Sequence, residues 1–197
     1  DLVFTAAPHG SSFEFMNQLA NTGVKIIDMS ADYRLDNSLS YDKWYGFAHP
    51  YPDLLKKFTF GLPEINRESI KSSNYVSTPG CTALTSILAL APLVNTNIID
   101  NNDIVIDAKV GSSGAGVKPT IASHHANRYG VIRLYKPYAH RHTAEIDQEL
   151  SKLSDTRVTA SLSVHSVNLV RGILCTSYAH IKNAINEVDI WKNFRQF

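Results

Sequence analysis

The chain has 197 residues, of which 44% are hydrophobic and 19% are charged, and its formal net charge is +1. This length can form one large domain or two small ones with a real core, and the near-neutral charge gives no electrostatic reason to expect nucleic acid or a membrane surface as the main partner. No apolar run approaches the roughly 20 residues that span a bilayer, and two cysteines are too few for a disulfide scaffold, which favours the reducing cytosol.

The first elements alternate between short apolar strands and a helix. Leu2–Ala6 is a strand, Phe13–Asn21 has apolar residues at helical spacing, and Val24–Ile27 is the next buried strand. Gly23 is suited to end the helix that separates them. This order predicts a βαβ unit in a parallel sheet, as in an α/β fold.

The region after this unit is expected to be mostly loop. Residues 32–63 are rich in aromatic and loop-forming side chains, and Tyr75–Thr78 then resumes a strand that stops at Pro79-Gly80. The composition changes at this turn. It therefore predicts a domain boundary near Pro79, with residues 1–78 in one domain and residues 79–197 in the other.

The second domain is predicted to combine helices with strands that each have one exposed face. In Asp103–Val110 and Val158–His165 apolar and polar residues alternate, which is the pattern of half-exposed strands in an antiparallel or mixed sheet. The other predicted elements are a helix at 82–94, a helix at 143–153 capped by Thr143, a strand at 172–178 and a helical segment at 186–197. The inward face of the first helix is expected to comprise Leu84, Ile87, Leu88, Ala91 and Val94.

Both ends of the chain fall inside such elements. The chain begins in the strand-like run Asp1–Ala7 and ends in a helical segment with Trp191 and Phe194 on one side. Because domain termini usually lie in exposed, weakly packed segments, we expect the chain to be a fragment of a longer protein.

The strongest local signal for chemistry is Cys81. A strand ends at Thr78, Pro79-Gly80 makes a sharp turn, and the cysteine stands where a long apolar helix begins. The N–H groups and the dipole of a helix N-terminus stabilise negative charge, which favours the nucleophilic thiolate. A buried structural cysteine at a turn is the alternative. Cys175 lies in the middle of a strand and is expected to be structural.

A second candidate is His140-Arg141-His142, followed by Glu145 in the first turn of a helix. Histidine can act as a general acid or base near pH 7, and arginine can hold a carboxylate or phosphate with two hydrogen bonds. With His124-His125 upstream a metal site has to be considered, but adjacent histidines do not converge on one ion and no familiar ligand spacing is complete, so no metal is expected. A solvated polar stretch that caps the helix is the alternative.

Two glycine-containing loops are candidates for binding anions or cofactors. Gly111–Gly116 follows an alternating strand, and its N–H groups and hydroxyls could form an anion-binding nest. It lacks the Lys-Ser/Thr ending of a P-loop and is not a G-x-G-x-x-G fingerprint, so an ordinary flexible turn is the alternative. Pro8-His9-Gly10 lies at a strand end that opens a helix, where cofactors bind in open parallel sheets.

Taken together, the motifs resemble a known family. They are, in chain order, Pro-His-Gly-x-Ser (8–12), Ser-Ala-Asp-Tyr-Arg-Leu (30–35), Tyr-Gly (45–46), Gly-Leu-Pro-Glu-Ile-Asn-Arg (61–67), Pro-Gly-Cys (79–81), Ser-Gly-Ala-Gly (113–116) and His-Arg-His-Thr-x-Glu-Ile (140–146). This order, from residue 1 to about residue 180, is similar to that of N-acetyl-γ-glutamyl-phosphate reductase, a family of the aspartate-semialdehyde dehydrogenase superfamily.

The resemblance implies an α/β fold: the second half of a Rossmann dinucleotide-binding domain, without its glycine-rich first part, followed by an α+β catalytic and dimerisation domain with a mixed sheet. It implies reduction of an acyl phosphate to the semialdehyde through a cysteine thioester, with NADP as cofactor, by a cytoplasmic homodimer or homotetramer in arginine or lysine biosynthesis. The catalytic residues that it implies are Cys81 and His140. The residues implied to bind substrate are Arg34, Ser112, Arg141, His142 and Glu145, and those implied to bind the cofactor are Pro8, His9, Gly10, Ser30, Gly114 and Gly116.

Two departures from the family pattern bear on the substrate. Thr82-Ala83 stands where the family has Tyr-Pro, and His165–Gly172 is more similar to the archaeal branch, which reduces glutamyl or aminoadipyl phosphate linked to a small acidic carrier protein. An acidic carrier requires basic residues near the cleft. The candidates are Arg128, Arg133, Lys136, Arg141 and Arg171. The alternatives are aspartate-semialdehyde dehydrogenase, whose cysteine usually follows Asn rather than the Gly80 found here, and a non-catalytic module that keeps the fold.

Overall fold

The computed structural model describes residues 1–182 and 184–197. The chain divides into two compact units, Asp1–Gly80 and Cys81–Phe197. Within the described residues, every helix is too short or too polar to cross a bilayer.

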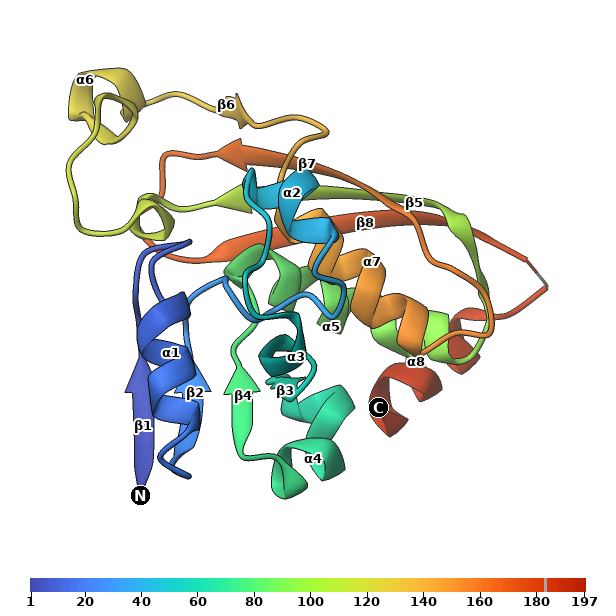
Figure 1. Ribbon diagram of the computed structural model, residues 1–197. Coiled ribbons are helices and arrows are strands. Elements are labelled where there is room, and N and C mark those ends of the chain that lie inside the picture. The colour runs from blue at the N-terminus through green and yellow to red at the C-terminus, as the bar shows by residue number, and fades with distance from the viewer. Residues whose placement is uncertain (183) are drawn as a thin grey trace. The chain divides into compact units, whose positions relative to one another are not determined.

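The first unit is built on a parallel four-stranded sheet in the order β1-β2-β4-β3 (Figure 1). Its strands are β1 (Leu2–Thr5), β2 (Lys25–Asp28), β3 (Phe58–Phe60) and β4 (Tyr75–Ser77), and α1 (Phe13–Ala20) connects the first two. The predicted strand–helix–strand unit and its parallel pairing are therefore confirmed.

The prediction of a mostly loop region at residues 32–63 is wrong in part. The region contains the short helices α2 (Ser40–Tyr45) and α3 (Pro52–Leu55) as well as β3, and α4 (Pro63–Ser72) follows it. These elements are too short to show a period in sequence, and aromatic packing holds them in place. Tyr41 is fully buried, and the ring of Tyr33 stacks on that of Phe58 at 4.3 Å between centroids.

The second unit contains a mixed four-stranded sheet in the order β6-β7-β5-β8. Its strands are β5 (Ile99–Val110), β6 (Arg133–Tyr135), β7 (Ala160–Ser166) and β8 (Ile173–Ile181). β5 runs parallel to β7 and antiparallel to β8, and β6 is antiparallel to β7. Ile104 and Ile106 are buried while Val105 between them is exposed, so the predicted alternation and the mixed sheet are both confirmed.

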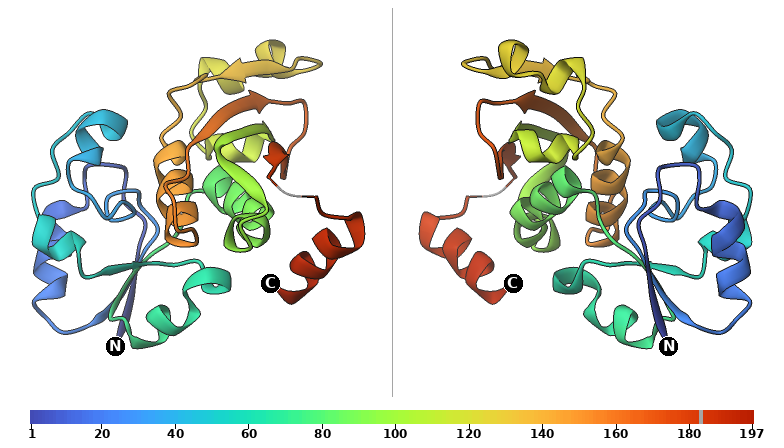
Figure 2. Two further views of the ribbon diagram at one scale, coloured as in Figure 1. Left: turned by 90° about the vertical axis from the view of Figure 1, so that its right-hand side faces the viewer. Right: turned by 90° about the vertical axis from the view of Figure 1, so that its left-hand side faces the viewer.

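Two helices, α5 (Cys81–Asn95) and α7 (His142–Lys152), pack against each other on one face of this sheet (Figure 2). Ile87 and Ala91 of α5 are fully buried as expected, but Leu84 and Leu88 are only half-buried, because the buried face is centred on Ala83, Ile87 and Leu90. Thr143 does not cap α7. The helix begins at His142, and its N-cap residue, Arg141, makes no side-chain capping bond.

The direction of these helices follows from their connections. α5 leads directly into β5 and α7 into β7, and the two strands are parallel. Both helices therefore begin at the end of the sheet where β5 and β7 finish. Ser86, one turn into α5, lies 3.6 Å from Cys175, which pairs with Ala108 near the end of β5, and this contact supports that direction.

The rest of the second unit consists of two parts. One is a long connection from β5 to α7, called the excursion here, and the other is a C-terminal helix. The excursion comprises η1 (Ser112–Ala115), η2 (Ile121–Ser123), α6 (His125–Arg128) and β6, and the last helix is α8 (Glu187–Gln196). The face of the sheet opposite α5 and α7 exposes Val105, Leu174 and Tyr178.

Candidate active site

Cys81 is the first residue of α5. β4 ends at Ser77, and the Pro79-Gly80 turn brings the chain directly into the helix. The thiol is free and exposed, and its Sγ atom lies 4.0 Å from Thr82 Oγ1. The first turn of a helix carries N–H groups without partners in the helix, and these favour a negatively charged group at this position. The alternative prediction, that Cys81 is a buried structural cysteine, is therefore wrong.

The second thiol has a different environment. Cys175 lies within β8 and is half-buried, and its Sγ atom is 3.6 Å from Ser86 Oγ. Burial raises the pKa of the Cys175 thiol above its usual value. Since the thiolate is the reactive form, burial makes the Cys175 thiol less reactive than an ordinary cysteine.

His140 and His142 are both buried, at 8% and 6% exposure, so the alternative of a solvated capping stretch is wrong. The main-chain N–H of His142 donates to Nδ1 of His140 at 3.3 Å, and the two rings meet edge to face with 4.6 Å between centroids. The ring of Tyr135 also meets that of His140 edge to face, at 5.8 Å between centroids. Burial, followed by the charges of Arg141 and Lys136, lowers the pKa of His140 to about 4.

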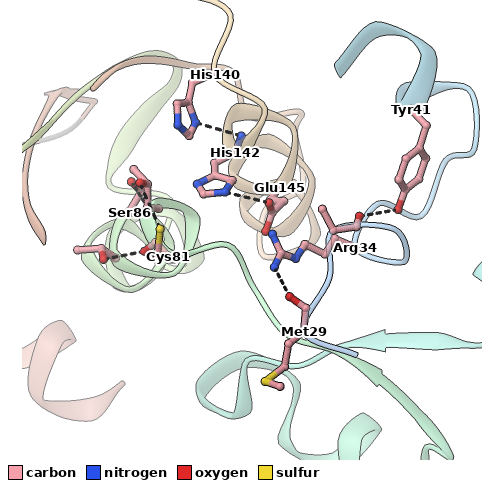
Figure 3. A network of polar contacts seen from close by, with 11 residues as sticks. Met29, Arg34, Tyr41, Cys81, Ser86, His140, His142 and Glu145 are labelled. Atoms are coloured by element: carbon pink, nitrogen blue, oxygen red, sulfur yellow. Dashed lines mark hydrogen bonds and ion pairs between the residues drawn. The ribbon is translucent and has the colours of Figure 1, made fainter. Parts of the chain in front are cut away.

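Cys81 and the two imidazoles lie at the same end of the second unit. α5 and α7 pack side by side and begin at the same end of the sheet, and Cys81 and His142 are their first residues. In Figure 3 the rings of His140 and His142 point from the start of α7 toward the side on which Cys81 and Ser86 lie. A candidate nucleophile and a candidate proton donor or hydrogen-bond donor, about 60 residues apart in sequence, thus lie at the same end of the second unit.

Glu145 and Arg141 belong to the same turn. The Glu145 side chain is fully buried, and its Oε1 atom lies 3.9 Å from Nε2 of His142. Arg141 is half-buried between the two histidines in sequence. The positive charge of Arg141 contributes to the lowered pKa of His140.

The Gly111–Gly116 loop does not form the predicted nest of free N–H groups. The N–H groups of Ser112 and Ser113 donate to the carbonyls of Leu169 and Val170, at 2.8 Å each. The N–H groups of Gly114 and Gly116 donate within the loop, to Gly111 and Ser113. A Cβ atom at Gly111 would lie 2.9 Å from the carbonyl oxygen of Val170. The glycine is therefore required for the close approach of two main-chain segments.

This loop nevertheless reaches the end of the sheet where Cys81 lies. Val167 donates its N–H to the carbonyl of Val110, and Arg128 donates to the carbonyls of Val110 and Val167 at 3.3 and 3.1 Å. Ser112, Gly114 and Gly116 are partly or fully exposed here. Because their N–H groups are already hydrogen-bonded, these residues can contact a ligand only through other atoms, such as the carbonyl groups or the Ser112 side chain.

In the first unit, the loop Pro8–Ser11 is exposed at the end of β1. The buried Asp32 carboxylate holds it from inside, accepting from the N–H of Gly10 at 2.8 Å, the N–H of Ser12 at 3.2 Å and the hydroxyl of Ser12 at 2.6 Å. Gly10 has a φ of +77°, which favours glycine. The N–H groups of Gly10 and Ser12, just before α1, are thus already bound to a carboxylate of the chain itself.

A second buried carboxylate occupies the neighbouring strand end. Asp28 accepts from the hydroxyl of Thr5 at 2.7 Å and from the hydroxyl of Ser30 at 2.6 Å, so Ser30 is directed toward a carboxylate of the chain. Arg34, also in this unit, is buried and donates from Nη2 to the carbonyl of Met29 at 3.1 Å (Figure 3). Sequence reasoning missed the role of Asp28 and Asp32, although Asp32 stands inside the Ser-Ala-Asp motif.

The neighbouring histidines of the excursion, His124 and His125, are exposed. In the part of the chain that the structure describes, histidine, cysteine and carboxylate side chains do not gather in a group of three that could hold a metal ion.

Comparison with known protein families matches both units. Residues 81–197 match the family model described as "Semialdehyde dehydrogenase, dimerisation domain", and residues 1–73 match "Semialdehyde dehydrogenase, NAD binding domain". Among solved structures, aspartate semialdehyde dehydrogenase II from Vibrio cholerae has a TM-score of 0.70 at 14% identity, over 99% of this chain and 60% of that one. The enzyme from Candida albicans with NADP has a TM-score of 0.61 at 13% identity, over 100% and 56%.

Curated relatives are considerably more similar in sequence. A putative LysW-L-2-aminoadipate/LysW-L-glutamate phosphate reductase from Nitrosopumilus maritimus is 55% identical over 100% of this chain and 56% of its own length. The reductase of the same name from Saccharolobus solfataricus is 43% identical, also over 100% and 56%. The chain therefore spans about half the length of the curated relatives that it matches, and the resemblance to the archaeal branch is confirmed.

Proposed function

The chain belongs to the semialdehyde dehydrogenase family, and from this premise we propose that it is part of an enzyme that reduces a carrier-linked aminoadipyl or glutamyl phosphate to the semialdehyde through a thioester on Cys81. The observation that carries the proposal is the exposed thiol at the start of α5 beside two buried imidazoles at the start of α7. We propose residues 1–78 as the cofactor-binding part and residues 79–197 as the catalytic part.

The chemistry begins at Cys81. Its thiolate attacks the acyl carbon, the bond from that carbon to the phosphate oxygen breaks, and phosphate leaves, which yields a thioester. When bound, a nicotinamide cofactor would supply the hydride that reduces the acyl group. The carbon–sulfur bond then breaks, which releases the aldehyde and restores the Cys81 thiolate. During both steps negative charge develops on the acyl oxygen, where His140 serves as the stabilising group.

The residues of the first unit fit such a cofactor at the end of β1. Open parallel sheets bind nucleotides at the carboxyl ends of their strands, and the exposed Pro8–Ser11 loop lies there. Because Asp32 binds the amides of Gly10 and Ser12 from inside, the outer surface of Pro8, His9 and Gly10 is what would contact the cofactor. We propose NADP, the cofactor that accompanies the Candida albicans enzyme in its crystal structure.

A carrier-linked substrate is favoured by the charge of the second unit. Residues 108–144 contain no Asp or Glu, although they include several lysines and arginines. Arg133, Lys136 and Arg171 are exposed, whereas Arg128 is engaged with main-chain carbonyls. We therefore place the surface for an acidic carrier on the excursion and on the segment around Arg171, with Arg141 nearest to the reacting group.

The open face of the second sheet supports a homodimer. Leu134, Leu174 and Tyr178 are exposed on it, at 48%, 64% and 62%. A second copy of this face would cover these apolar side chains, in agreement with the family description of this domain as a dimerisation domain. The two free thiols suit a reducing compartment, and we propose the cytoplasm.

Aspartate-semialdehyde dehydrogenase is the second candidate within the same chemistry. The solved structures of that enzyme share the fold at 13–16% identity. Gly80 before the cysteine and the archaeal relatives favour the carrier-linked substrate instead. A non-catalytic module that keeps the fold has no need of an exposed thiol at a helix start beside a buried histidine pair.

The test uses the full-length protein in two experiments. In the first, the carrier-linked acyl phosphate is added without cofactor, and mass spectrometry looks for an acyl adduct on Cys81; the adduct should persist in Cys175→Ala and be absent in Cys81→Ala. In the second, kcat/KM is compared for carrier-linked glutamyl and aminoadipyl phosphate, acetylglutamyl phosphate and aspartyl phosphate. A preference for acetylglutamyl or aspartyl phosphate would overturn the substrate, and the lack of any adduct with all four would overturn the chemistry.

A further inference from the structure

Three polar side chains, Asp107, Lys109 and His165, form a cluster on the open face of the second sheet, called the Asp107 cluster here. The Asp107 carboxylate accepts a hydrogen bond from Nζ of Lys109, and its Oδ1 atom lies 2.8 Å from Nδ1 of His165. Val105 is exposed between two buried isoleucines, so the residues two and four positions later on β5 lie on the same open face. His165 pairs with Lys109 across the sheet and shares this face.

The neighbours of the cluster on this face are apolar. In the pairing of β5 with β8, Leu174 lies beside Lys109, and in the pairing of β6 with β7, Leu134 lies beside His165. These two leucines are 64% and 48% exposed. The side chains of the Asp107 cluster are only 28–33% exposed. The cluster is therefore a charged group within the apolar surface that the proposed homodimer covers.

The two charges of the cluster balance each other within one copy. The hydrogen bond from Lys109 lowers the pKa of Asp107, and the contact with His165 acts in the same direction, so the carboxylate is ionised at neutral pH. One cation thus faces one anion. Because this arrangement offers no excess of positive charge, it does not suit an acidic carrier protein as the partner of this face.

Both charged groups keep hydrogen-bonding capacity that one copy does not use. A lysine ammonium has three N–H donors, and an ionised carboxylate has about four acceptor positions. Within residues 1–182 and 184–197, the Lys109 ammonium donates one bond and the Asp107 carboxylate has two partners. A surface that covers the cluster has to supply an acceptor and a donor, because a charge buried without partners costs free energy. A second copy of the same cluster supplies both.

Two-fold symmetry brings a patch on one copy against the same patch on the other. We propose that the Asp107 cluster lies at a two-fold axis between two copies of this chain, where Lys109 of each copy donates to Asp107 of the other. Charges of opposite sign then alternate around the axis, with the apolar side chains of the open face around them. His165 is a positioning residue, because its contact holds one oxygen of the carboxylate. The inference rests on the homodimer of the proposed function but not on the proposed reaction.

Two complementary variants of the full-length protein test the reciprocal contacts. In a homodimer, Lys109→Met leaves two carboxylates facing each other, and Asp107→Asn leaves two ammonium groups. A heterodimer of the two variants keeps one contact between Lys109 of one copy and Asp107 of the other. We expect the Kd of each variant homodimer to rise roughly 30-fold or more, and the heterodimer to bind more tightly than either. Sedimentation velocity with one variant fluorescently labelled measures the three constants.

Two further measurements separate the interface from folding. Lys182→Met, at an exposed lysine that donates to Asn97, is the matched control and should keep the wild-type Kd. The other measurement needs no substitution: ¹⁴N- and ¹⁵N-labelled wild-type proteins are mixed and treated with a carbodiimide, which joins a carboxylate directly to an amine. We expect mass spectrometry to find Asp107 joined to Lys109 between a light and a heavy peptide.

The outcomes distinguish the inference from the proposed reaction. A heterodimer no tighter than the two variant homodimers would overturn the inference, and so would a wild-type dimer without the light–heavy cross-link. A wild-type protein that stays monomeric would overturn both the inference and the proposed homodimer. A full-length protein that forms no acyl adduct on Cys81 would overturn the proposed reaction, and the association constants would still decide the role of the Asp107 cluster.

Discussion

The carboxylate of Asp32 accepts a hydrogen bond at 2.8 Å from the N–H group of Gly10, 22 residues earlier in the chain. With the two bonds from Ser12, it fixes the loop that connects β1 and α1. A helix N-terminus in this kind of sheet commonly faces a ligand phosphate. Here the chain's own carboxylate binds the N–H groups of Gly10 and Ser12, which precede α1, so these two groups are not free for a ligand.

Replacing this carboxylate should weaken both the fold and cofactor binding. In Asp32→Asn one acceptor oxygen becomes an NH₂ group that confronts the Gly10 or Ser12 donors, so the free energy of unfolding should fall by about 2–3 kcal/mol. Cofactor affinity should fall because the loop is no longer held. Urea unfolding and calorimetric titration of the full-length protein measure the two effects. Asp53→Asn, at an exposed carboxylate paired with Lys56, is the control and should change neither; equal effects in both variants would contradict the role of Asp32.

The two thiols should react at very different rates. Cys81 is exposed at a helix start, whereas Cys175 is half-buried and its pKa is raised by burial. Iodoacetamide at neutral pH should therefore modify Cys81 first, as mapped by mass spectrometry. Cys81→Ser should lower kcat by roughly 10³-fold or more, and Cys175→Ser should retain most activity. Faster labelling of Cys175 would reverse the assignment.

The buried His140 should make stability depend on pH in a defined window. The folded protein holds the ring neutral, with a pKa of about 4 against an ordinary value of 6.5, so the unfolded chain binds more protons between these values. The contribution of the neutral ring is fully present above pH 6.5 and is lost as the pH falls toward 4, by roughly 3 kcal/mol. His140→Gln should flatten the curve of unfolding free energy against pH, while His180→Gln, at an exposed histidine, should leave it unchanged. A variant curve parallel to that of the wild type would show that another group titrates.

Gly111 should be intolerant of even one methyl group. A Cβ atom there would lie 2.9 Å from the carbonyl oxygen of Val170 and 3.0 Å from main-chain carbon of Arg171, and neither can rotate away. Gly111→Ala should therefore cost about 1–3 kcal/mol of stability and loosen the bonds that join the η1 loop to Leu169 and Val170. Hydrogen exchange of the Ser112 and Ser113 amides reports the second effect directly. Ser113→Ala, which keeps these main-chain bonds, should exchange as slowly as the wild type.

The carrier surface can be probed with two exposed arginines of the second unit. Arg171 precedes β8 and lies at the end of the sheet where Cys81 lies, whereas Arg157 precedes β7 at the opposite end. Arg171→Glu should lower kcat/KM for a carrier-linked substrate by roughly 10-fold at low salt, with a smaller effect at high salt. The rate with a small acyl phosphate should change little. Arg157→Glu is the matched control, and a similar loss in that variant would move the docking surface elsewhere.

Local features of the chain were readable from its sequence because their physical cause is local. The period-two alternation around Ile104 and Ile106 identified strands with one buried face, since each strand residue points to the side opposite its neighbours. The Pro79-Gly80 turn before an apolar run placed Cys81 at a helix start. The short elements between residues 32 and 63 were not predicted from the sequence, because β3 spans only three residues and owes its position to aromatic packing.

Only the tertiary structure decided which polar groups are available for chemistry. The amides of Gly10 and Ser12 are bound by Asp32, and those of Ser112 and Ser113 by carbonyls of the segment before β8. Each partner lies 20 or more residues away, so the glycine patterns that suggest free anion-binding amides cannot reveal that those amides are already used. The neutral state of His140 depends in the same way on its burial in the folded chain. Sequence determined which chemical groups this protein carries, and the path of the folded chain decided which of them are free, buried or neutral, because hydrogen bonding and burial depend on neighbours in space.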